Sequence, residues 1–190
     1  DEEGKALASR TVEYPLHTPN PGWTEQDPED WWNAAVNSIQ AVLGESGVDA
    51  SEIKGVGLSG QMHGSVFLDK NNKVIRRAIL WNDQRTADEC DEIRSRVGRE
   101  RFIQITGNDA LTGFTAPKLL WVRNHEPELF SRARRVLLPK DYVRLRLTGE
   151  YAMDRAGGAG TVLFDLAARS WSSELLEMLD LDPAWFPPTF

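Results

Sequence analysis

The chain has 190 residues, of which 41% are hydrophobic and 27% are charged, so it can bury one substantial core and is not expected to be disordered. A formal net charge of -7 disfavours nucleic acid and anionic membranes as partners, because neither surface attracts an acidic protein. The single cysteine, Cys90, cannot form an internal disulfide and no apolar run is long enough to span a membrane, so we expect a cytoplasmic protein.

The first part of the chain predicts a strand, a loop and an amphipathic helix. Residues 6–14 alternate loosely between apolar and polar positions, which predicts a strand, and the Pro-rich stretch after them predicts a loop. Asp27 and Pro28 have the residue types of an N-cap and a first helical position. A helix is therefore expected over residues 29–43, ending at Gly44.

Short strands and then mostly helices are predicted for the rest of the chain. Apolar stretches predict strands, two of them joined as a hairpin, at residues 53–58, 65–68, 73–75 and 135–138. Helical periodicity follows at residues 84–97, 100–106, 115–124, 140–147 and 171–179. Thr115 is expected to cap the helix that follows it. Without a repeat or linker, the pattern indicates one domain of the α/β class.

Residues 55–60 spell Gly-x-Gly-x-x-Gly, a pattern found where a helix N-terminus holds the pyrophosphate of a dinucleotide. That site needs a strand before the glycines and a helix after them. Here a helix precedes the glycines and more strand is predicted after them, so dinucleotide binding is not expected. Because glycine has no Cβ, these positions instead allow the backbone to approach another group closely.

Polar side chains that suit a hydroxyl-rich ligand follow the glycines. Gln61 and His63 offer an amide and an imidazole for hydrogen bonds, and Met62 between them is adaptable. A buried histidine that bonds to a neighbouring backbone group is the alternative.

A second cluster, with Trp81, Asn82, Asp83 and Arg85, mixes an aromatic ring with amide, carboxylate and guanidinium groups, as polyol sites do. Its alternative is structural: Asp83 would cap a helix and Trp81 would fill the core.

Four motifs together resemble the xylulokinases, which belong to a carbohydrate kinase family that also contains glycerol, gluconate and ribulose kinases. The motifs are Gln61–Gly64, Trp81–Arg85, Gly113–His125 and Leu138–Tyr142. The third matches the constrained positions of that family's first signature, including Lys118 and Trp121. The resemblance extends from about Glu3 to the end of the chain.

The resemblance implies an actin-like, ribonuclease H-like α/β fold, of which residues 1–190 would form a partial N-terminal sugar-binding domain. It also implies that Met62 and His63 touch a ketose. The segment 81–85 and the loop 111–115, with Phe114, would lie near the same pocket. Lys118 and Trp121 are more often structural residues in such positions.

By the same resemblance, the complete protein would transfer the terminal phosphate of ATP, with Mg²⁺, to the 5-hydroxyl of D-xylulose. The family's phosphate-handling strand would precede this chain, and its general base, an aspartate, would lie beyond Phe190, followed by the ATP-binding domain. No catalytic, cofactor-binding or metal-binding residue is therefore expected among residues 1–190, and the fragment alone is expected to be inactive. Asp154 precedes a glycine-rich bend typical of the family and is not expected to be the base.

Two other functions stay open. One is another sugar or polyol kinase of the family, for gluconate, ribulose or glycerol, although Met62 and His63 favour xylulose over glycerol. The other is a non-catalytic sugar-binding module. Strand edges without partners would also allow a homodimer.

Overall fold

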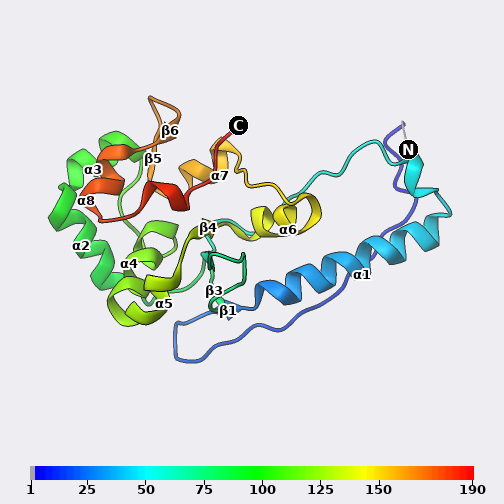
Figure 1. Cartoon of the computed structure of the whole chain (residues 1–190), viewed down its shortest axis with the longest axis horizontal. Helices are drawn as coiled ribbons and strands as arrows, with labels where there is room; N and C mark the ends of the chain where they lie inside the picture. Colours follow the sequence, from blue (N-terminus) through cyan, green and yellow to red (C-terminus); the bar gives the residue numbers. More distant parts are fainter. Residues whose placement is uncertain (1–2) are drawn as a thin grey trace.

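The computed structural model describes residues 3–190: a body of short helices and strands from which one long helix, α1 (Pro28–Ser46), extends (Figure 1). Asp27 caps α1 by accepting a hydrogen bond from the Glu29 N–H at 3.0 Å, and Pro28 is its first residue, as predicted. The helix ends at Gly47, whose φ of 66° is left-handed, and not at Gly44, which stays helical. Residues 5–16 run alongside α1 in extended form.

Helices form most of the body. They are α2 (Ala87–Val97), α3 (Arg99–Thr106), α4 (Thr115–His125), α5 (Pro127–Arg132), α6 (Pro139–Thr148), α7 (Arg155–Ala159) and α8 (Ser173–Met178), with 3-10 turns η1 (Ala50–Glu52) and η2 (Pro183–Trp185). The predicted helices are confirmed, and α5 and α7 are additional. No helix within residues 3–190 combines the length and apolarity needed to cross a bilayer.

The strands are short and pair two by two, always antiparallel. The pairs are β1 (Glu25–Gln26) with β3 (Ala78–Ile79), β2 (Val66–Leu68) with β4 (Arg135–Leu137), and β5 (Phe164–Asp165) with β6 (Ser170–Trp171). The predicted strands at 65–68 and 135–138 are therefore partners of each other. A bridge between Ser65 and Ile79 links the first two pairs, and one between Leu68 and Val74 forms the predicted hairpin.

Two of the predicted strands do not form. Residues 6–14 and 53–58 have no place in a β-ladder among residues 3–190. Their apolar residues predict extended backbone correctly, but a strand also needs a neighbour to hydrogen-bond with. The residue pattern of one segment does not show whether that neighbour exists.

Two hydrophobic clusters lie on either side of β2. Val66 and Leu68 point into a cluster with Trp31 of α1 and Tyr142 of α6, whereas Phe67 points into the larger cluster around α2, α3, α4 and α8. Successive strand residues face opposite sides, so one three-residue strand joins both clusters. α4 lies deep in the body, with residues 115–122 all buried.

Candidate functional site

A strained turn at residues 61–64 leads into β2. His63 has a φ of +62°, the left-handed region that costs a residue with a Cβ roughly 1–2 kcal/mol. The Gly64 N–H donates to the Met62 carbonyl at 2.7 Å, and the Gln61 side-chain amide donates to Gln26 Oε1 at 2.8 Å. The Met62 side chain is 60% exposed. The turn thus presents Met62 to the surface on a fixed backbone.

Gly64 is needed because the turn presses against α6. A Cβ at this position would lie 2.7 Å from Cγ of Pro139, closer than packed atoms approach. We expect Gly64→Ala to lower the free energy of unfolding by about 1–3 kcal/mol, because Pro139 or the turn must shift. Urea denaturation measures this. Gly44→Ala is the control, since a Cβ on Gly44 has open space; equal stability of the two variants would contradict the close packing.

The His63 imidazole lies in a tight, half-buried position. Its ring meets the edge of Phe114 with centroids 4.9 Å apart, and a Cβ on Gly160 would lie 2.8 Å from its Cε1. Nδ1 is buried without a hydrogen-bond partner among the described residues. Burial lowers the pKa of His63, and the nearby charge of Lys118 lowers it further. At neutral pH the ring is therefore neutral, with one nitrogen as donor and the other as acceptor.

Two residues at the start of α4 bind the backbone of this turn. The Thr115 hydroxyl and the Lys118 ammonium both donate to the His63 carbonyl at 3.1 Å, and Lys118 also donates to the Gly113 carbonyl at 2.6 Å. Thr115 was expected to cap α4, but it is the first helical residue, and the cap position is Phe114. The Thr115 hydroxyl therefore donates to the 61–64 turn and does not cap its own helix.

Within the second predicted cluster, Trp81 and Asn82 lie at the surface. The Trp81 side chain is 52% exposed, and Asn82 accepts a hydrogen bond from the Thr24 hydroxyl at 2.8 Å. Gly113 lies against Trp81, because a Cβ there would be 2.8 Å from the Trp81 carbonyl. The structure therefore brings the 81–82 segment, the loop before α4 and the 61–64 turn side by side.

Asp83 and Arg85 lie inside the protein instead. Their side chains are 0% and 1% exposed and form an ion pair at 2.8 Å, while Arg85 also reaches Glu25 at 2.8 Å. The Arg85 guanidinium lies over Trp23 and Trp121, at 3.9 and 4.8 Å from the ring centroids. Direct contact with a ligand would require these protein contacts to break.

The alternative interpretation, in which Asp83 caps a helix, is wrong. Its Oδ1 accepts from the Arg85 N–H at 2.9 Å and its Oδ2 accepts from the Thr24 N–H at 2.6 Å, whereas α2 begins after Thr86. The carboxylate therefore ties the 81–85 segment to the loop before β1, and α2 starts without a side-chain cap.

Two residues of the site carry no signal in the sequence. Gly160 belongs to a glycine-rich bend whose contact with the His63 ring is not readable from spacing, and Glu25 bridges Arg85 and Arg76 from a two-residue strand. Both act through contacts between segments far apart in the chain. Only the close match of the surrounding motifs to a family could have drawn attention to them.

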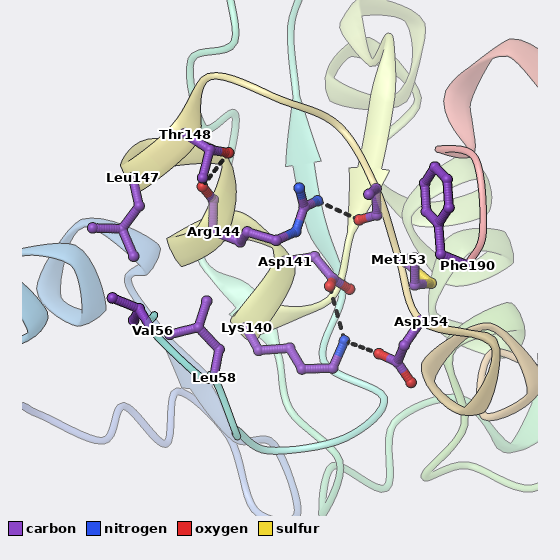
Figure 2. Close-up of a pocket in the computed structure, with 11 residues that line it drawn as sticks. Val56, Leu58, Lys140, Asp141, Arg144, Leu147, Thr148, Met153, Asp154 and Phe190 are labelled. Atoms are coloured by element: carbon purple, nitrogen blue, oxygen red, sulfur yellow. Dashed lines mark hydrogen bonds and ion pairs between the residues drawn. The ribbon is translucent and has the colours of Figure 1, made fainter. Parts of the chain in front are cut away.

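An open pocket of about 660 Å³ lies between α6, the 56–58 segment and the C-terminus (Figure 2). Lys140 lies between two carboxylates there, 2.8 Å from Asp141 and 2.5 Å from Asp154. Asp154 also caps α7 by accepting from the Gly157 N–H at 2.7 Å. Although burial raises the pKa of Asp154, its hydrogen bonds with Lys140 and Gly157 lower it overall. A carboxylate that is paired with a cation and has a lowered pKa is a poor general base.

The glycines at 55–60 do not form a dinucleotide site. Residues 53–60 are extended, and no helix begins directly after them. The N-terminal N–H groups that hold a pyrophosphate in such sites are therefore not presented here. In residues 3–190, no group of three His, Cys, Asp or Glu side chains is placed to hold a metal ion.

A family model described as "FGGY family of carbohydrate kinases, N-terminal domain" matches residues 1–190. The chain belongs to this family. It is 47% identical to the xylulose kinase of Klebsiella pneumoniae, over 100% of this chain and 38% of that protein. This FGGY chain thus spans about two fifths of the length of the curated relatives it matches.

Solved FGGY-type structures share the fold. The ligand-bound xylulose kinase of Lactobacillus acidophilus superimposes with a TM-score of 0.92 at 28% identity, over 100% of this chain and 38% of its own. The gluconate kinase of the same organism superimposes with a TM-score of 0.91 at 28% identity, over 99% of this chain and 38% of its own. A mixed helix and strand chain with these neighbours is consistent with an actin-like fold.

Proposed function

We propose that this chain is the sugar-binding part of an ATP-dependent D-xylulose kinase. The observation that carries the proposal is the strained Met62–His63 turn, fixed beside Phe114 and close to the segment that carries Trp81. The identity of 47% to a xylulose kinase supports the choice of sugar. We further propose the ribonuclease H-like class, with residues 1–190 as part of the N-terminal domain of a cytoplasmic protein.

The side chains of the turn suit a ketose. Because Nδ1 is buried, a neutral His63 ring can offer only Nε2 to a sugar hydroxyl, as a donor or as an acceptor, while exposed Met62 and Trp81 offer apolar surface to the C–H face of the sugar. Asp83 and Arg85 hold the 81–82 segment in place from inside the protein. The chain's own residues would therefore bind and orient the sugar.

In the complete protein, ATP with Mg²⁺ supplies the phosphoryl group. Residues 3–190 offer it neither a phosphate loop at a helix N-terminus nor a metal-binding cluster, and we expect the general base to be an aspartate outside this chain. The partner we propose is a small ketose and not nucleic acid or membrane, and a homodimer is compatible with the exposed extended segments.

A substrate panel with the complete protein tests the proposal. We expect kcat/KM for D-xylulose to exceed that for D-ribulose, gluconate and glycerol by about tenfold or more, which corresponds to roughly 1.4 kcal/mol of selective binding in the transition state. Coupled detection of ADP measures each rate. Faster turnover of gluconate or ribulose would make the sugar assignment wrong, and binding without any turnover would point to a sugar-binding module.

A further inference from the structure

Lys118 is buried in the first turn of α4 and lies between the two loops of the candidate site. Its side chain is 0% exposed, which is rare for lysine. Its two hydrogen-bond acceptors are backbone carbonyls: that of His63 in the turn and that of Gly113 in the loop before α4. The ammonium therefore joins the segment that carries Met62 to the segment that carries Phe114.

The buried surroundings of Lys118 disfavour the charged form of its amine. Burial lowers the pKa of Lys118 to about 7, Asp83 and Cys90 act in the opposite direction, and Arg85 acts with burial. An apolar side chain of equal length would fill the same space without this desolvation. Both the charged and the neutral amine carry at least two hydrogens, so both forms can hold the two carbonyls.

The turn needs such support. His63 has a left-handed φ, and a backbone conformation of this kind persists only where surrounding contacts over-determine it. Its carbonyl accepts from Thr115 as well as from Lys118, so two donors from α4 fix the orientation of one peptide group. We therefore expect loss of either donor to let that peptide group rotate and to move the His63 ring.

We propose that Lys118 is a positioning residue for the sugar, holding the 61–64 turn and the 113–114 loop in the one arrangement in which Met62, His63 and Phe114 face the same ligand. The proposal rests on the sugar-binding role proposed for this turn. Misplacement of binding groups by about 1 Å can cost up to about 100-fold in rate or affinity, so the expected effect is large although Lys118 itself does not touch the sugar.

The test is Lys118→Met in the complete protein, because methionine keeps the length and apolar volume and removes both donors. We expect the KM and the calorimetric Kd for D-xylulose to rise about tenfold or more, with a smaller fall in kcat and an unchanged KM for ATP. The thermal midpoint is expected to stay within a few degrees, since a desolvated charge is removed. Lys70→Met, at an exposed hairpin turn, is the matched control.

Thr115→Val is the second variant, because it removes one donor to the same carbonyl without changing the shape of the side chain. A smaller rise in KM, about three- to tenfold, is expected. Unchanged sugar affinity in Lys118→Met would overturn the proposal, as would equal losses for sugar and ATP. If Lys118→Met fails to fold, unchanged affinity in Thr115→Val overturns it. If the parent prefers another sugar, the same comparison is made with that sugar, which separates this proposal from the choice of substrate.

Discussion

Replacing Arg85 with alanine is expected to destabilise the protein by about 3–5 kcal/mol, the cost typical of removing one partner from a buried ion pair. Asp83 and Glu25 would lose the guanidinium that lies 2.8 Å from each. The space between Trp23 and Trp121 would also empty, with loss of the contacts to both rings. The effect is on stability, because the Arg85 side chain is buried.

The urea midpoint followed by tryptophan fluorescence measures this effect, since Trp23 and Trp121 flank the site. Arg77→Ala, at an exposed position, is the control and is expected to change the free energy of unfolding by less than about 0.5 kcal/mol. Arg85→Lys should recover only part of the loss, because an ammonium lacks the planar fork that reaches two carboxylates. A normal midpoint with a raised KM for sugar would instead mean that Arg85 contacts the ligand, as the motif predicts.

Local signals in the sequence predicted the elements that depend on local chemistry. Asp27 and Pro28 define the start of α1, as their residue types predict. The strand at 6–14 was predicted from alternation and the strand at 53–58 from its apolar residues, and neither forms a ladder. Pairing depends on a second segment, which periodicity within one stretch does not describe.

In the candidate site, too, the sequence predicted the polar segments but not which of their side chains are buried. The turn at 61–64 was predicted as a polar feature after the glycines, and the structure adds the left-handed backbone of His63 and the two donors from α4 that hold its carbonyl. The 81–85 motif looked like one polar cluster, but burial separates exposed Trp81 from buried Asp83 and Arg85. Whether a side chain faces ligand or core depends on the packing of distant segments, which residue types in a row do not determine.

Gly160→Ala is expected to weaken D-xylulose binding in the complete protein while leaving stability almost unchanged. The backbone of Gly160, with φ -67° and ψ -10°, is one that alanine adopts readily, so the backbone itself is not strained by the change. The new Cβ would lie 2.8 Å from Cε1 and 3.0 Å from Nδ1 of His63, which forces the imidazole to turn away. A side-chain rotation of this kind costs about 0.5–1.5 kcal/mol but moves the ring nitrogen Nε2 that would hold the sugar.

We expect the Kd for D-xylulose, measured by calorimetry, to rise about tenfold, which corresponds to roughly 1.4 kcal/mol, with the KM for ATP unchanged. Gly44→Ala is again the control, because it adds the same methyl group on an open face of α1. A Gly160→Ala protein that binds D-xylulose as tightly as the parent would mean that the orientation of the His63 ring does not matter for the sugar. The ketose site would then have to lie away from the 61–64 turn, because His63 is the main reason for assigning sugar binding to that turn.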